Sequence, residues 1–169
     1  VDNFWVTTTL GYDKKPLQSV SRGDADLSAI PLKDAAATPR PEDAAIAGSL
    51  VGELKRCLNE AIGDVVVSKR LVDSPACLVA PGDGPDRGLE RLLSRQDQGT
   101  GMLPNLEINL GHPVVQALAR LAKSADQSEF ADRAWLLLDG ARIVDGEPPF
   151  SAVKFAERLN RALARDAER

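Results

Sequence analysis

The sequence is poor in the residues that build metal-bound, disulfide-stapled or membrane-spanning proteins. Aromatic residues make up 4% of the 169 residues, and there are only two cysteines and one histidine. A structural zinc site normally takes four Cys or His ligands, so the sequence predicts no metal site. Cys57 and Cys77 are twenty positions apart without a CxxC motif, and we interpret them as small buried residues in a reducing cytosol.

Long apolar runs and an excess of positive charge are also missing. No stretch approaches the roughly 20 apolar residues that cross a bilayer, and the first residues lack the pattern of a signal peptide. The net charge of −4 and the pI of about 5.1 argue against a general nucleic-acid binder. We therefore expect no membrane and no nucleic-acid partner. Since the chain begins with Val1, we also expect a piece of a longer protein.

Motifs of catalysis and cofactor binding are scarce. The sequence contains no GxGxxG or GxxxxGK[ST] phosphate loop and no GxSxG nucleophile elbow. His112 is the only candidate general base, and its place before Pro113 is typical of a helix N-cap. We expect no catalytic, cofactor or metal residues in this chain, and a small enzyme that uses His112 is the weaker hypothesis.

A proline-rich segment indicates a domain boundary. Residues 21–41 combine Ser, Gly, Asp and Ala with three prolines, which is typical of a linker. Before it, residues 17–20 alternate apolar and polar side chains like a short strand. After it, apolar residues recur every four positions, which predicts a helix from Pro41 to a stop at Gly63.

The rest of the chain alternates short strands with helices. Residues 65–67, 76–79 and 106–108 read as strands. Leu89, Leu92 and Leu93 lie on one side of a short helix, with Glu90, Arg91 and Arg95 opposite, and glycines flank that helix on both sides. Another helix begins at Pro113.

The strongest pattern is a pair of helices at the C-terminal end. Asp126 with Glu129 forms a capping box for a helix over 127–144, Gly146 is a stop, and a Pro-Pro corner leads to a second helix over 150–165. Both helices carry wide apolar stripes. Either the stripes close the core of the same chain, or two copies dock into a four-helix bundle. The predicted fold class is α+β: a small three-stranded sheet with helices and a C-terminal two-helix hairpin that, in the second case, forms a four-helix bundle in the dimer.

Four sequence blocks resemble one family. RLVDSPACLV at 70–79 is similar to the R-L-x-D-[ST]-P-A segment of the bacterial heat-shock-protein-90 chaperones of the HtpG type. LEINLGHP at 106–113, AWLLLDGA at 134–141 and FAERLN at 155–160 resemble L-E-[IL]-N-P-x-H-P, L-L-L-D-Q-A and F-x-x-R-[LM]-N of that family, in the same order. PLQSV at 16–20 is similar to the strand that ends its middle domain. Leu110 and Gly140 depart from the family's Pro and Gln.

The resemblance implies an ATP-driven dimeric chaperone of the cytoplasm, active in protein folding and the stress response. Residues 1–27 correspond to the end of its middle domain and 28–169 to its C-terminal dimerisation domain. ATP and Mg²⁺ belong to missing upstream domains, so this fragment is expected to be no enzyme. The family's closing helices place the homodimer interface at Trp135, Leu137, Leu138, Ala141, Val153, Phe155, Leu159, Ala162 and Leu163.

The resemblance also implies a surface for unfolded or metastable client proteins. It maps onto Phe4 and Trp5 and onto the leucines of the short helix, Leu89, Leu92 and Leu93. A short helix between glycine-rich segments can present apolar side chains to a client, although the same leucines could equally pack into the core. A monomeric protein-binding adaptor is the alternative function.

Overall fold

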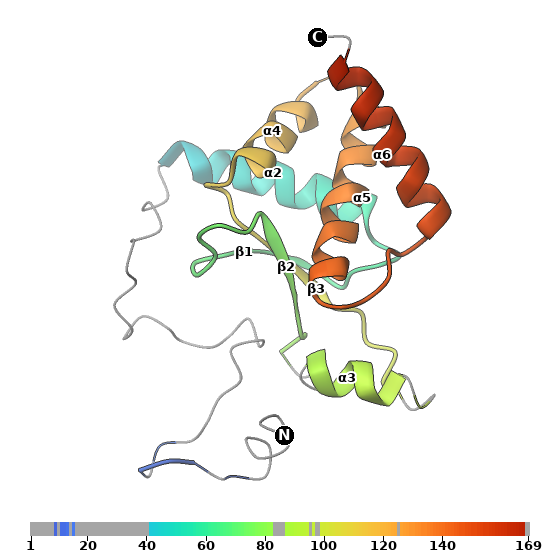
Figure 1. The fold of residues 1–169 in the computed structure, drawn as a ribbon. Coiled ribbons are helices and arrows are strands. Elements are labelled where there is room, and N and C mark those ends of the chain that lie inside the picture. The colour runs from blue at the N-terminus through green and yellow to red at the C-terminus, as the bar shows by residue number, and fades with distance from the viewer. Residues whose placement is uncertain are drawn as a thin grey trace.

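The computed structural model describes residues 9, 11–13, 15, 41–82, 87–94, 96, 99–124 and 126–167 (Figure 1). These residues contain a mixed α+β arrangement of five helices and one small open sheet. In chain order the elements are α2 (Pro41–Cys57), β1 (Val65–Val67), β2 (Ala76–Val79), α3 (Arg87–Ser94), β3 (Asn105–Ile108), α4 (Pro113–Ala122), α5 (Gln127–Val144) and α6 (Ala152–Ala167).

The sheet has β3 at its centre. β1 pairs with β3 in parallel and β2 pairs with β3 antiparallel, which gives the order β1-β3-β2. The register aligns Val66, Glu107 and Cys77 in one row across the three strands. Because side chains alternate along a strand, this row points away from the face that carries Leu106 and Ile108.

Helices α2, α4 and α5 close the core against the sheet (Figure 1). Their apolar stripes meet the sheet's inner face, so one continuous cluster joins all these elements. Its most deeply buried members are Leu50, Leu54, Leu58, Leu106, Ile108, Val115, Leu118, Phe130 and Leu138. Helix α6 packs on the outside of α5.

Local signals set the helix ends as predicted, but the capping box forms only in part, because the backbone N–H of Asp126 donates to Ser124 Oγ at 3.3 Å and not to Glu129. The Asp126 carboxylate accepts a hydrogen bond from the backbone N–H of Glu129 at 2.8 Å, so it caps α5. His112 Nδ1 accepts from the N–H of Val114 at 3.2 Å and caps α4. Gly146 ends the α5 segment with a φ of +81°, a conformation that favours glycine.

One expectation about an individual element is wrong. The first helix ends at Cys57 and not near Gly63, because the chain continues in turns that are closed by the bonds of Ala61 N–H and Ile62 N–H to the Leu58 carbonyl. These turns still bury Leu58 and Ile62, so the four-residue spacing marked the core correctly but not the helix end. Glu90 of α3, which the sequence predicts on the side opposite the leucines, is buried.

Several other expectations lie outside the described residues. They are the strand at 17–20, most of the linker at 21–41 and the boundary between 27 and 28. In the part of the chain that the structure describes, no helix is long and apolar enough to span a membrane.

Candidate functional site

Helix α6 carries an apolar stripe that the rest of the chain leaves uncovered. Val153 is 69% exposed and Leu163 is 60% exposed, and Leu159 between them is also exposed. Leu159 and Leu163 are four positions apart and lie above one another on the helix, and Val153, ten positions before Leu163, lies at the margin of the same side. The opposite face of α6 carries the arginines that hold it on α5.

Beside this stripe lies an apolar groove between three helices. The groove has a volume of about 590 Å³. Val114 and Ala117 of α4 line it, together with Gly140 and Val144 of α5 and Ala162 of α6. Gly140 lies inside α5, where glycine costs about 1 kcal/mol relative to alanine, and a Cβ added to it would meet nothing within 4 Å.

Ion pairs and one cation–π contact fix α6 on α5. Arg161 donates to both carboxylate oxygens of Asp132, each at 2.7 Å. This guanidinium lowers the pKa of Asp132, and the partial burial of the carboxylate opposes that effect. The Arg158 guanidinium lies 4.7 Å from the centre of the Trp135 ring. The stripe of α6 is therefore held in a defined orientation.

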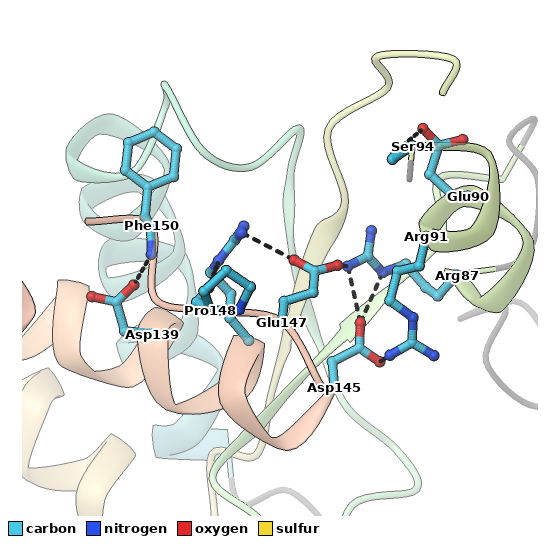
Figure 2. Close-up of polar contacts among 10 residues, drawn as sticks. Arg87, Glu90, Arg91, Ser94, Asp139, Asp145, Glu147, Pro148 and Phe150 are labelled. Atoms are coloured by element: carbon cyan, nitrogen blue, oxygen red, sulfur yellow. Dashed lines mark hydrogen bonds and ion pairs between the residues drawn. The ribbon is translucent and has the colours of Figure 1, made fainter. Parts of the chain in front are cut away.

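The corner between α5 and α6 is tied to a buried carboxylate. Asp139 is fully buried, and its Oδ1 accepts a hydrogen bond from the backbone N–H of Phe150 at 2.7 Å (Figure 2). Its Oδ2 has no hydrogen-bond partner among the described residues, but Arg158 Nη1 lies 3.9 Å away. The carboxylate thus bridges the start of the second helix to the middle of the first.

The structure divides the predicted interface residues into two groups. Those of α5 are buried in the chain's own core, where Leu137 and Ala141 also line the groove. Those of α6 are half-buried or exposed. The first group is Trp135, Leu137, Leu138 and Ala141, and the second is Val153, Phe155, Leu159, Ala162 and Leu163. Their role in an interface stays a prediction.

Of the predicted client residues, the leucines of α3 are described. Leu89 is 44% exposed, Leu92 is 54% exposed and Leu93 is half-buried. Phe4 and Trp5 lie outside the described residues.

Sequence reasoning missed the residues that hold α3. Arg87, which no sequence pattern singles out, is the first residue of α3, and its side chain is only 7% exposed. It pairs with Asp145 and Glu147, which follow α5 (Figure 2). These partners are 58 and 60 positions away, so no local pattern could have identified them.

The outer face of the sheet carries a second polar cluster. Arg70 Nη2 lies 2.7 Å from Glu107 Oε2, and Ser68 Oγ donates to Glu107 Oε1 at 2.6 Å. Cys77 lies beside this pair with its Sγ 3.6 Å from Glu107. Burial, with the nearby Glu107 carboxylate, raises the pKa of the Cys77 thiol to about 11. Both Cys57 and Cys77 are free and half-buried, less buried than predicted.

Comparisons of the sequence with known proteins identify the family. The family model described as Hsp90 protein matches residues 1–169. The chain belongs to the Hsp90 family. Curated relatives include three proteins named Chaperone protein HtpG, each aligned over 98% of this chain. The one from Azorhizobium caulinodans is 48% identical to this chain, the one from Rhizobium meliloti is 45% identical, and the one from Rhodopseudomonas palustris is 44% identical.

This Hsp90-family chain spans 26% of the length of each of those relatives. The resemblance seen in the four sequence blocks is thereby confirmed for the whole chain. The α+β fold class with its three-stranded sheet is confirmed as well.

Proposed function

We propose that this chain is the C-terminal part of an ATP-dependent chaperone and that it joins two protomers into a homodimer. The observation that carries the proposal is the contrast between the two helices of the hairpin. The apolar stripe of α5 is buried by the chain itself, whereas Val153, Leu159 and Leu163 of α6 stay in contact with water. Burying one such side chain contributes about 1.5–3 kcal/mol of favourable free energy, so a partner that covers this face would be bound more tightly.

A second copy fits this face because the surface has both parts of a self-complementary contact. A two-fold interface uses the same patch on both subunits, so that patch must contain a projecting part and a receiving part. The α6 stripe projects, and the groove beside it, which Ala162 of the same helix lines, can receive a stripe. Two hairpins packed in this way make a four-helix bundle.

Client contact is the second part of the proposed function. Leu89 and Leu92 place apolar surface in water on α3, a helix separate from α6 and its stripe (Figure 1). Exposed apolar patches bind the apolar segments of unfolded chains. Together with Leu93, and with Phe4 and Trp5 as implied by the family, they are the proposed contacts for unfolded or metastable client proteins.

The remaining functions belong to the parent protein in this proposal. ATP and Mg²⁺ act in its upstream domains in the cytoplasm, while this chain uses no cofactor. Joining two ATPase arms at one end keeps them at a high effective concentration, so they meet each other and not other molecules.

Light scattering after size exclusion tests the dimer. The chain is expected to run at twice its 18.1 kDa mass at micromolar concentration. Leu163→Glu is expected to run as a monomer, because the dimer would bury an unpaired carboxylate at a cost of several kcal/mol. A mass near 18 kDa for the unchanged chain would instead support a monomeric adaptor and contradict the proposal.

Leu92→Glu is the matched control. It places the same charge on another exposed leucine and is expected to leave the dimer intact. Binding of reduced, carboxymethylated α-lactalbumin, a permanently unfolded chain, is instead expected to depend on the leucines of α3. Leu92→Glu should weaken this binding about tenfold, whereas Val72→Glu, which places the same charge on an exposed apolar residue outside α3, should not.

A further inference from the structure

Helix α3 is inverted with respect to an ordinary surface helix. All eight of its residues are described, and the two that are buried are the charged Arg87 and Glu90. Leu89 and Leu92 face the solvent instead. Apolar packing would turn this helix over and bury the leucines, so other contacts must hold it in its observed orientation.

An ionic clamp at the first turn of α3 supplies those contacts. The Arg87 guanidinium donates to Asp145 Oδ2 from Nη2 at 2.9 Å and from Nε at 3.3 Å, and it also pairs with the Glu147 carboxylate (Figure 2). Arg91, one turn later, lies 3.2 Å from the other oxygen of Asp145. Arg142 of α5 lies 3.1 Å from Glu147, so every member has an opposite charge.

The turn after α5 is shaped for this clamp. Gly146 separates the two carboxylates and adopts a φ of +81°, which a residue with a side chain rarely takes. The turn directs Asp145 and Glu147 together toward Arg87 (Figure 2). A guanidinium suits this place, because its planar fork can serve two carboxylates at once.

The other buried charge of α3 anchors the segment that follows the helix. Glu90 accepts hydrogen bonds from both the backbone N–H and the hydroxyl of Thr100, each at 2.9 Å. Gly99 permits this approach, because an added Cβ would lie 2.5 Å from Ser94 Oγ and 3.1 Å from Glu90 Oε1. Both buried charges of α3 are therefore engaged, Arg87 with the turn after α5 and Glu90 with the segment that follows the helix.

We infer that Arg87 is a positioning residue, and that its ion pairs to Asp145 and Glu147 at the α5–α6 corner hold α3 so that its leucines face outward. The role of those leucines in client contact rests on the proposed function above. The clamp also links the proposed client surface physically to the dimerisation hairpin, since Asp145 and Glu147 lie between α5 and α6.

Hydrogen exchange of the α3 amides, measured by mass spectrometry on the 169-residue chain, tests the clamp. Arg87→Gln and Glu147→Gln are each expected to raise the exchange rate of these amides at least about tenfold, because each change removes a buried ion pair that joins α3 to the turn after α5. The double variant should exchange no faster than the faster single variant, since both changes break the same contact. Arg87→Lys, which keeps the charge, should restore part of the protection.

Matched controls separate the clamp from general destabilisation. Arg56→Gln breaks an exposed pair with Glu53 on α2 and should leave α3 exchange unchanged. The β3 amides should stay protected in every variant. Unchanged α3 exchange in Arg87→Gln, or fully additive effects in the double variant, would overturn the inference.

Binding of carboxymethylated α-lactalbumin then distinguishes the two proposals. If Arg87→Gln both frees α3 and weakens this binding several-fold, the clamp and the client surface are supported together. Freed α3 with unchanged binding would support the clamp and overturn the assignment of the leucines to clients.

Discussion

At the scale of single residues, the outer face of the sheet shows how a buried charge is accommodated. Glu107 points away from the core but is only slightly exposed, and Arg70 and Ser68 satisfy its two oxygens. Cys77 shares this enclosure from the neighbouring strand. A thiolate there would be poorly solvated and would face a carboxylate, so the thiol stays protonated.

The Cys77 thiol is therefore predicted to react slowly. Alkylation of Cys77 by iodoacetamide, followed by peptide mass spectrometry, should reach half of its maximum rate only near pH 11 in the folded chain. At pH 8 the rate should be about a hundredfold below that of the same cysteine in urea, because only the thiolate reacts. Glu107→Gln should speed the reaction, since it removes the repelling charge; rapid alkylation of the unchanged folded chain at pH 8 would contradict the account.

At the scale of elements, the α5–α6 hairpin depends on charges for its geometry. The Arg161 pair holds the pKa of Asp132 below its usual value. A carboxylate with a lowered folded-state pKa contributes stability above its unfolded pKa, near 3.9, and loses it as the pH falls through the folded value.

Removing the Asp132 charge should consequently lower stability only above that range. Asp132→Asn is expected to lower the thermal midpoint by roughly 1–4 °C at neutral pH. The difference from the unchanged chain should shrink below about pH 4. Circular dichroism measures both midpoints, and Glu53→Gln at the exposed α2 pair serves as the control. A difference that persisted undiminished at pH 2 would show that the charge is not its cause.

The helices and strands also show which parts of the fold the sequence predicts. The strands at 65–67 and 76–79 and the helix at 127–144 were predictable, because periodicity and caps are local. The end of α2 was not, since Leu58 and Ile62 keep the four-residue spacing while the backbone turns.

The candidate site was predictable to a smaller extent. Leu138 and Leu163 belong to similar stripes, yet one is buried in the chain and the other is exposed. Spacing identifies an apolar face but not what covers it. Arg87 is the opposite case: its partners lie almost sixty positions away, so only the folded chain brings them together.

At the scale of the whole molecule, one face carries the hairpin stripe and groove, and a separate helix carries the outward leucines. The first is the proposed contact between protomers and the second is the proposed contact with clients. The Arg87 clamp joins the two through ion pairs between α3 and the α5–α6 corner.

Hydroxyl-radical footprinting of α6 tests the central claim most directly, because it reports the exposure of each side chain in solution. If a second copy covers the stripe, oxidation of Leu159 and Leu163 should be strongly suppressed at concentrations where the chain is dimeric and should rise on dilution. Leu89 and Leu92, exposed on α3, should react equally at both concentrations. Rapid oxidation of Leu159 and Leu163 in a chain that scatters light as a dimer would contradict the account, since the two copies would then meet elsewhere.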